Sequence, residues 1–250
     1  VVDVGDRLIT PAFVNAHTHL PMMAFRSIGQ ADDFEGNVVE DLFFRLETNL
    51  TGDDIRAFAR MGAYESLLSG VGCVWEHYYG GLDLAAALVE VGLCGVVAPT
   101  LQDKGGPGIG QLDEQLDATH RLVSDERWRA KGVVAALGPH ATDTVSDALW
   151  ETIGELAEQY TVPIHSHVSQ SVEEYERSYE EFGCSPVERL DRVGVLNAGP
   201  SMLLVHSLFA SDDDLRRLRP GQHVLGYCPY SQVQFGFPAP VSAWRRRGLG

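Results

Sequence analysis

Two histidines one residue apart end the first apolar run of the chain, which reads PAFVNAHTHLP over residues 11–21. Side chains two positions apart on a strand point to the same face, so His17 and His19 can present two imidazoles to one point. Neutral imidazole is a good ligand for zinc and for iron. The pair therefore indicates a metal site, although so short a motif is weak evidence on its own.

Other apolar runs also end at histidines: His77, His140, His167 and His206. His167 could complete a facial set with His17 and His19, leaving positions for a carboxylate and a water. His165 shares a face with His167, so the residues alone leave both open as the third ligand. Taken alone, His77 is expected to be hydrogen-bonded or half-exposed. Two more are predicted to be structural: His120, within a helix, and His223, at a strand start.

Short apolar runs alternate with amphipathic segments along the whole chain. The predicted strands are Ala12–His17, Val71–His77, Gly95–Thr100, Gly132–Leu137, Val162–His167, Met202–His206 and His223–Tyr227. Between them, N-cap residues predict the starts of helices at Thr51, Ser146, Ser171 and Ser211. Such an alternation predicts parallel strands joined by crossover helices.

A doubly wound sheet and a (β/α)₈ TIM-type barrel both fit this pattern. Histidines at five strand ends favour the barrel, because all strand ends of a barrel converge on one mouth where active sites are built. In a doubly wound sheet only the ends near the switch point would meet. Residues 1–250 hold about seven β/α units, and the chain stops at Arg247-Gly-Leu-Gly250.

The balance of charge argues against two classes of partner. The chain has 35 acidic and 19 basic residues and a net charge of −16, which disfavours nucleic acid and anionic membranes. The run Arg245-Arg246-Arg247 is too short for a nucleic-acid patch and is expected to end a helix. No apolar run is long enough for a membrane span, and no signal pattern stands at the N-terminus.

Four scattered cysteines without a C-x-x-C pair are expected to be reduced and mostly buried: Cys73, Cys94, Cys184 and Cys228. A cytoplasmic location fits this pattern. The glycine-rich stretch Gly105–Gly110 lacks the Lys-Ser/Thr of a phosphate loop, so a loop without phosphate is the better interpretation.

Five stretches, in order along the chain, resemble the amidohydrolase superfamily, in its chlorohydrolase and aminohydrolase branch. These are Asp6–Met22 with its HTH, Gly138-Pro-His140 followed by Thr144-Val-Ser146, Ile164-His-Ser-His167 with Glu174, Leu204-Val-His206, and Cys228-Pro-Tyr-Ser231. The branch includes triazine hydrolases and deaminases of guanine, cytosine and S-adenosylhomocysteine.

The resemblance implies a barrel that binds one divalent metal, zinc in preference to iron. In the family's pattern His17, His19 and His167 are the metal ligands. His206 matches a catalytic histidine that contacts the water or the substrate, and His140 matches a substrate-binding histidine. Arg26 matches, more loosely, an arginine at the pocket rim. In the implied mechanism a metal-bound hydroxide attacks an electron-poor carbon, and an amine or a halide leaves.

The chain departs from the family pattern at three points. Gln170 stands where a glutamate shuttles the proton, and an amide cannot exchange a proton at neutral pH. Gln170 could still orient water or substrate. The expected aspartate of the eighth strand has no match, and Glu76 is the only acid at a comparable strand end. Tyr227 replaces a common histidine, which changes the substrate-binding pocket.

We therefore expect a barrel truncated before its eighth strand and lacking the small β-sandwich domain of the family. The open edges beside the first and last strands would be unpaired. Self-association through these edges, giving a homo-oligomer, is one way to cover them.

Two functions are consistent with the sequence. The first is a metal-dependent hydrolase acting on a C–N or C–Cl bond of a small nitrogen-rich heterocycle, of the deaminase or chlorohydrolase type. The second is an amidohydrolase-fold binding or assembly protein that no longer turns over. Substrate choice would depend on the loops Gln30–Asn37 and Leu101–Gln111.

Overall fold

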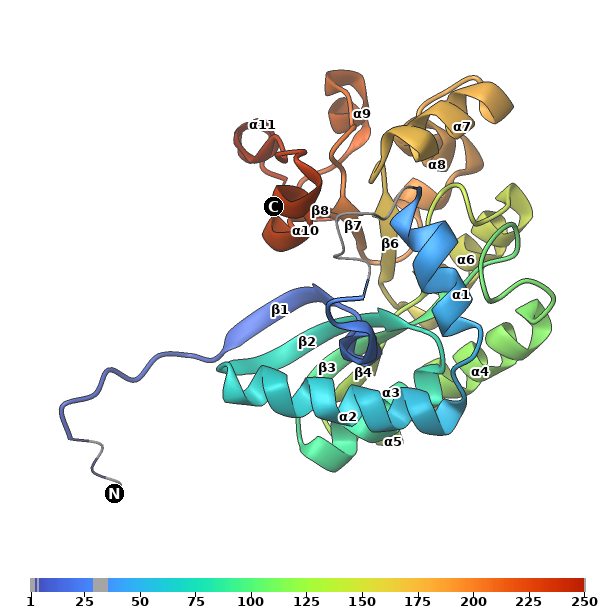
Figure 1. Ribbon diagram of the computed structural model, residues 1–250. Coiled ribbons are helices and arrows are strands. Elements are labelled where there is room, and N and C mark those ends of the chain that lie inside the picture. The colour runs from blue at the N-terminus through green and yellow to red at the C-terminus, as the bar shows by residue number, and fades with distance from the viewer. Residues whose placement is uncertain (1–2, 4, 29–35, 250) are drawn as a thin grey trace.

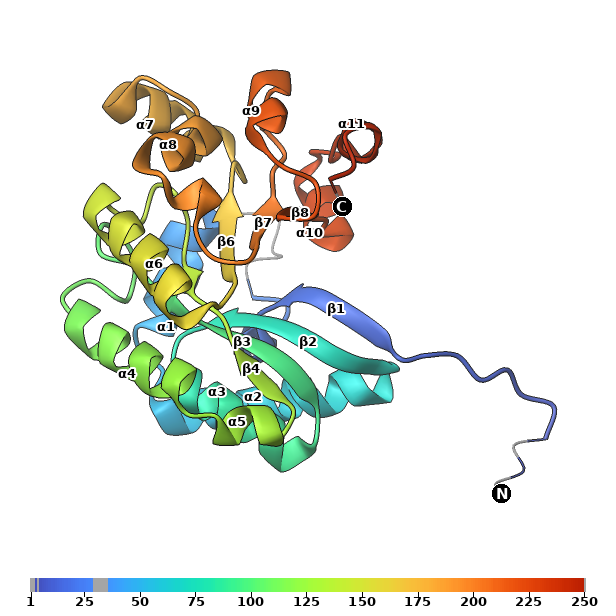
Figure 2. The same ribbon diagram turned by 180° about the vertical axis from the view of Figure 1, so that it is seen from behind.

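The computed structural model describes residues 3, 5–28 and 36–249 and is drawn from two sides in Figures 1 and 2. The predicted specificity loop Gln30–Asn37 lies outside the described residues except for Gly36 and Asn37. In the described part of the chain, no helix has both the length and the apolar character needed to cross a membrane.

All paired strands run parallel, in two sheets. The first sheet has the order β1-β2-β3-β4, with β5 also paired to β3, and the second has the order β6-β7-β8. The strands are β1 (Phe13–Thr18), β2 (Val71–Tyr78), β3 (Cys94–Leu101), β4 (Val133–Ala135), β5 (Gly138–Pro139), β6 (Ile164–Val168), β7 (Met202–His206) and β8 (His223–Gly226). Helices pack along the outer sides of both sheets (Figure 1).

Backbone hydrogen bonds join the two sheets through the segment that holds β4 and β5. The N–H of Leu137 donates to the carbonyl of Pro163 (2.9 Å), and the N–H of His165 donates to the carbonyl of Leu137 (2.8 Å). The N–H of His167 donates to the carbonyl of His140 (3.1 Å). The strands thus form one curved, parallel α/β surface, as the alternating pattern predicted.

The two ends of this surface do not meet in the part of the chain that the structure describes. The strands β1 and β8 each have a partner on one side only. No closure into a barrel is therefore seen among these residues, and the truncation before an eighth strand stays a prediction. Self-association across the two edges stays a prediction.

The fourth predicted strand, Gly132–Leu137, is shorter than predicted, since β4 covers only Val133–Ala135. The separate two-residue β5 follows the predicted range and pairs with the end of β3. Gly138 approaches the backbone of Ala98 and Pro99 so closely that a Cβ would overlap their carbonyl oxygens. Only glycine permits that approach, and Pro139, which follows, has no N–H to continue the ladder.

The four predicted helix starts are confirmed by their caps. The hydroxyls of Thr51 and Ser211 form capping boxes with the residue three positions on, and those of Ser146 and Ser171 accept a backbone N–H. The α-helices are α1 (Phe44–Glu47), α2 (Gly52–Leu68), α3 (Gly81–Val91), α4 (Leu112–Ser124), α5 (Arg127–Ala130), α6 (Asp147–Tyr160), α7 (Val172–Phe182), α8 (Pro186–Val193), α9 (Asp212–Arg217), α10 (Pro229–Phe235) and α11 (Val241–Arg246). The 3₁₀ helices η1 (Leu20–Phe25) and η3 (Val195–Asn197) and the π-helix η2 (Val38–Phe43) complete the set.

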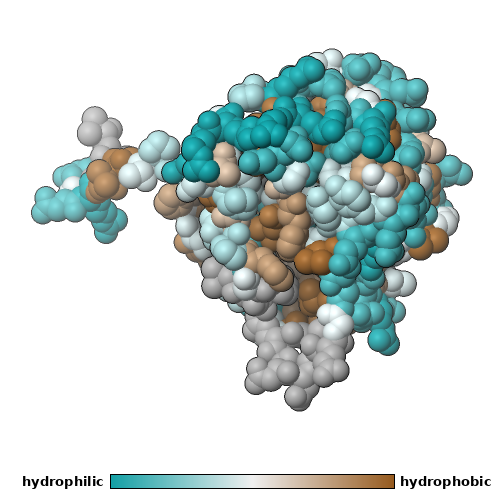
Figure 3. All heavy atoms as spheres, turned by 90° about the horizontal axis from the view of Figure 1, so that it is seen from above, coloured by the Kyte–Doolittle hydropathy of each residue, from teal (hydrophilic) through white to brown (hydrophobic). Residues whose placement is uncertain are grey.

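Apolar side chains pack between the strands and the helices in two clusters. One lies around β6–β8 and α6, and the other around β2, β3, α2 and α3. The face of α6 that is buried follows the helical period, with Leu149, Trp150, Ile153, Leu156 and Ala157 all inside. The face of the molecule seen from above in Figure 3 is mainly hydrophilic, with apolar residues gathered near its centre.

Replacing Ile153 with alanine is expected to lower the free energy of unfolding by about 2–5 kcal/mol, because the side chain is fully buried and leaves a cavity. Urea unfolding of the variant and the parent measures this loss. Leu68→Ala is the control, since Leu68 is 90% exposed and its loss should change stability by less than about 0.5 kcal/mol. Equal effects at both positions would mean that α6 is not packed as described.

The prediction for the cysteines is corrected in part. All four are free thiols, but only Cys184 is buried, and Cys94 is exposed. Cys94 begins β3, at the end of the strand opposite the histidines, where the sheet is open to solvent. The apolar residues next to Cys94 in the sequence therefore did not indicate that its side chain is exposed.

Candidate metal centre

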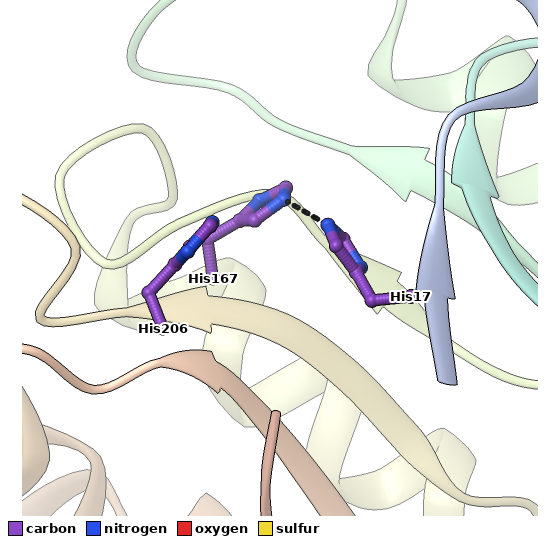
Figure 4. Close-up of side chains that lie close together, drawn as sticks. All are labelled: His17, His167 and His206. Atoms are coloured by element: carbon purple, nitrogen blue, oxygen red, sulfur yellow. Dashed lines mark hydrogen bonds between the residues drawn. The ribbon is translucent and has the colours of Figure 1, made fainter. Parts of the chain in front are cut away.

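Seven histidines lie together at the C-terminal ends of the strands, on the inner side of the curved surface. They are His17 on β1, His19 directly after β1, His77 on β2, His140 after β5, His165 and His167 on β6, and His206 on β7. His167 is central, because its ring centroid lies 4.9 Å from that of His17, 5.3 Å from that of His19 and 4.9 Å from that of His77. Figure 4 shows His17, His167 and His206 pointing toward one another.

The backbone fixes which nitrogen carries the proton in two of these rings. Nδ1 of His167 contacts the carbonyl of His140 (2.8 Å), and Nδ1 of His19 contacts the carbonyl of His77. A carbonyl oxygen only accepts, so both Nδ1 atoms must be the donors. In the neutral rings each Nε2 therefore carries a lone pair and no proton.

A third ring is oriented by another histidine. Nδ1 of His17 lies 2.8 Å from Nε2 of His165, a distance at which one of the two nitrogens donates to the other. When His17 donates, its own Nε2 is left as a lone pair. Histidines that bind a metal usually donate their second N–H to a fixed acceptor in this way. His165 is thus the hydrogen-bond partner of a candidate ligand, and His167 as the third ligand stays a prediction.

Nε2 of His167 lies between two of these lone pairs, 3.3 Å from Nε2 of His17 and 3.3 Å from Nε2 of His19. Neutral lone pairs repel each other at this distance, and a cation beside them removes the repulsion. Ligands about 2.0–2.1 Å from a tetrahedral zinc ion lie about 3.3–3.4 Å apart, which matches these two distances. Two clusters of potential ligands, His17 with His167 and His206, and His19 with His77 and His167, each have one ring nitrogen per residue within 4.8 Å of the others. His167 belongs to both clusters, and imidazole nitrogens at such spacing suit a zinc ion.

Burial keeps the rings in the form that binds metal. It lowers the pKa of His140 and His165 to about 3 and that of His206 to about 4. Burial also lowers the pKa of His17, His19, His77 and His167. Each ring is therefore neutral at pH 7, and a metal need not displace a proton from a ligand nitrogen.

The backbone beside the cluster adopts conformations that non-glycine residues rarely take. His206 and Ser207, at the end of β7, have φ angles of 73° and 46°, and Ser169, after β6, has a φ of 52°. Such left-handed residues concentrate at active sites, where the surrounding structure holds them in place. The turn after β7 thereby directs His206 back over the ring of His167, on which it stacks at 5.5 Å.

A cavity of about 430 Å³ opens beside the cluster. His140, Gln170 and His206 line it, together with residues of η2 and α1 such as Val39 and Phe44. This volume lies within the roughly 300–1,000 Å³ typical of small-ligand pockets. The structure thus brings three of the predicted catalytic and substrate-binding residues to one cavity. The contribution of η2 and α1 was not predicted, because neither segment carries a motif.

Two predicted substrate-binding residues are not brought to this cavity. The guanidinium of Arg26 is paired with the carboxylate of Glu65 on α2, and its side chain is 60% exposed. Tyr227, which follows β8, is 51% exposed and is not among the described residues that line the cavity. A contact of either residue with substrate stays a prediction.

Glu76 and Glu174 are two acids near the site whose carboxylates accept backbone hydrogen bonds. Glu76 is fully buried on the side of β2 that faces away from His77, and its Oε2 accepts from the N–H of Leu20 (2.8 Å). It therefore holds the turn after His19 and cannot replace the missing aspartate. Glu174 accepts from the N–H groups of Ser169 (3.0 Å) and Gln170 (2.7 Å) and so stabilises the loop after β6.

The sequence did not predict that His77 belongs to the histidine cluster. Its side chain is 1% exposed, and its Nδ1 lies 3.3 Å from the hydroxyl of Thr100, so of the two expectations the hydrogen-bonded residue is confirmed and the half-exposed one is not. Its position on β2 places it opposite β6 across the curved surface, next to His165 and His167. A signal was present, since His77 ends a predicted strand as the other site histidines do.

The metal-free chain is expected to lose stability as the pH falls from about 6.5 toward about 4. Eight histidines, the seven of the cluster and His223, have a pKa lowered by burial, so below the ordinary value of 6.5 the unfolded chain binds their protons and the folded chain does not. Burial raises the pKa of five carboxyls, with those of Glu47 and Glu174 at about 7 and those of Glu76, Asp83 and Asp143 above the ordinary value, and these groups favour the folded state as the pH falls. The more numerous histidines dominate this balance.

Urea unfolding in the presence of a chelator, from about pH 7 to about pH 5, measures this dependence. The expected net slope is on the order of 1 kcal/mol per pH unit, comparable to one uncompensated group. A free energy of unfolding that rises over this range as the pH falls would contradict the neutral, buried state of the cluster.

Comparisons with known proteins agree with this geometry. The family model described as Amidohydrolase family matches residues 8–224. The chain is 29% identical over 255 residues to the 5-methylthioadenosine/S-adenosylhomocysteine deaminase of Symbiobacterium thermophilum, covering 99% of this chain and 56% of that protein. It is 31% identical over 252 residues to the 5′-deoxyadenosine deaminase of Methanothermobacter thermautotrophicus, covering 100% of this chain and 58% of that protein.

Among solved structures, an adenosine deaminase from Xanthomonas campestris with bound zinc superposes with a TM-score of 0.84 at 26% identity. The match covers 96% of this chain and 54% of that one. The chain thus spans a little more than half the length of the relatives it matches.

Proposed function

The chain belongs to the amidohydrolase family, and from that premise we propose that it forms the metal-binding part of a hydrolase that deaminates an adenine nucleoside. The observation that carries the proposal is that Nε2 of His167 lies 3.3 Å from Nε2 of His17 and from Nε2 of His19, beside a cavity of ligand size. The relatives named above are, by name, deaminases of adenosine or of its 5′-substituted forms, which favours release of an amine over release of a halide.

In this proposal the site holds one divalent ion, zinc in preference to iron, on His17, His19 and His167. When bound, zinc would supply a Lewis acid that lowers the pKa of water toward neutrality. His206 faces the cavity as a neutral ring that can accept a hydrogen bond from the attacking water. In the net reaction a water oxygen bonds to the ring carbon, the C–N bond breaks, and ammonia leaves.

His140 is suited to hold the substrate. Its Nδ1 lies 2.9 Å from the hydroxyl of Thr144, and its ring packs near that of Phe44 at 5.5 Å, at the edge of the cavity. Since Nδ1 is engaged, Nε2 is the atom left for a purine nitrogen or a ribose hydroxyl. Phe44 offers an apolar face against which a flat base can stack.

The zinc-loaded protein should be assayed for ammonia release from adenosine, 5′-deoxyadenosine, 5′-methylthioadenosine and S-adenosylhomocysteine, with guanine and a chlorotriazine as comparison substrates. Turnover confined to the adenine nucleosides would support the proposal. If the zinc-bound protein neither turned over nor bound any adenine nucleoside, the proposal would be refuted.

A second candidate function is binding without turnover, and one observation favours it. Gln170 lines the cavity at the position where the family pattern has a proton-shuttling glutamate, and the neighbouring Glu174 is engaged by backbone N–H groups. A site of this kind could bind a small molecule and convert it slowly or not at all. The Gln170→Glu variant separates the two functions.

A further inference from the structure

We propose that His77 supplies a fourth nitrogen ligand, Nε2, to the metal centre from its buried side. The inference rests on the proposed function only in requiring that a metal binds at all. It extends the three-histidine set by a residue of β2 that the family's motifs do not include.

The surroundings of His77 leave Nε2 free for this role. The ring is 1% exposed, and Nδ1 lies 3.3 Å from the hydroxyl of Thr100. Nε2 is buried and has no partner of hydrogen-bond geometry among the described residues. A buried nitrogen without a partner destabilises the folded chain, and coordination to a metal would remove that cost.

The position of His77 is also suitable. One ring nitrogen each from His19, His77 and His167 lie within 4.8 Å of one another. Two nitrogens on one tetrahedral zinc ion are about 3.3–3.4 Å apart, so binding by all three residues would require their rings to draw together by at most about 1.5 Å. With Nε2 on the metal, Nδ1 carries the proton and donates it to Thr100, as the partner of a metal-bound histidine usually requires.

The side from which His77 approaches matters for the chemistry. His140 and His206 line the cavity, whereas His77 is not among its described lining residues. A fourth ligand from the closed side would leave the cavity side of the metal for water and substrate, as a catalytic site requires. No carboxylate joins either histidine cluster in the described part of the chain, and Glu76 points away.

The competing role of His77 is structural. The carbonyl of Pro139 also lies near its ring and is a possible acceptor for it. If His77 donates to Pro139, its nitrogen is not on the metal, and its removal should change folding stability but not metal affinity. The two roles therefore differ in a measurable quantity.

The test compares the parent chain with His77→Phe and His77→Gln, and uses His120→Phe as the matched control, because His120 lies on α4 and contacts Tyr160 outside the cluster. Zinc affinity is measured by competition with a chelator, and the fold of each metal-free variant by circular dichroism and thermal unfolding. We expect both His77 variants to bind zinc more weakly by more than about 100-fold, beyond the roughly 10–100-fold that loss of a ligand's hydrogen-bond partner costs.

A crystal structure of the zinc-loaded parent chain, with anomalous scattering at the zinc edge, gives an answer that does not depend on any variant folding. A zinc–Nε2 distance to His77 of about 2.0–2.1 Å would establish the ligand. A zinc ion on His17, His19 and His167 but beyond bonding distance of His77, or a His77→Phe affinity reduced by less than about 10-fold, would overturn the inference and leave the proposed function standing. A parent chain that binds no zinc would overturn both.

Discussion

Replacing His167 with alanine is expected to abolish zinc binding by the chain. Its Nε2 lies 3.3 Å from Nε2 of both His17 and His19, and it is the member shared by the two clusters of potential ligands. Without this side chain, His17 and His19 would no longer have a third nitrogen within 3.3 Å of both their Nε2 atoms. We expect the affinity for zinc to fall by more than about 100-fold, because loss of a ligand exceeds loss of its hydrogen-bond partner.

Elemental analysis after dialysis against a weak chelator measures this loss, with about one zinc per chain expected for the parent and almost none for His167→Ala. His120→Ala should keep its zinc, since that histidine lies outside the cluster. His165→Ala should give an intermediate loss of roughly 10–100-fold, because it removes only the partner of His17. A His167→Ala chain that still holds one zinc would place the metal elsewhere.

Replacing Gln170 with glutamate is expected to raise the rate of deamination by about 10²–10⁴, the usual contribution of a positioned general acid or base. Gln170 already lines the cavity beside His140 and His206, so a carboxylate of nearly the same size would stand at the right place. It could take a proton from the attacking water and give it to the leaving amine. The amide can do neither.

Steady-state rates of ammonia release from the best nucleoside substrate check this prediction, with zinc content measured in parallel. Gln159→Glu on the exposed face of α6 adds the same charge away from the cavity and should leave the rate unchanged. A large gain confined to Gln170→Glu would mean that the natural chain has lost one proton-transfer group but keeps the rest of the machinery. Equal, negligible rates in both variants would favour the function of binding without turnover.

Much of the fold followed from local pattern. Strands covered on both faces have to be nearly continuous apolar runs, and all seven predicted strands begin and end within two residues of those observed. Helix starts were marked by residues such as Thr51 and Ser211, whose hydroxyls satisfy backbone N–H groups that have no other partner. Where an element departed from its pattern, at Gly138, the cause was a close contact with another strand.

The site was predictable only in part. His17 and His19 share a face because they lie two residues apart on one strand, and the resemblance to the amidohydrolases selected His167. The sequence did not show that His77 is buried in the same cluster or that Glu76 faces away from it. It also did not show that Arg26 pairs with Glu65. Each of these depends on which neighbouring element the side chain meets.

The sequence by itself determined the order of strands and helices, the histidines at the strand ends, and the absence of a glutamate at position 170. Only the tertiary structure decided what the histidines do. His17 meets His165, which is 148 residues away, and His19 meets the carbonyl of His77, which is 58 residues away. Those contacts set which nitrogen keeps its proton, and therefore which lone pairs face the metal position. Local sequence does not predict these contacts, because they arise from the register and curvature of the assembled strands.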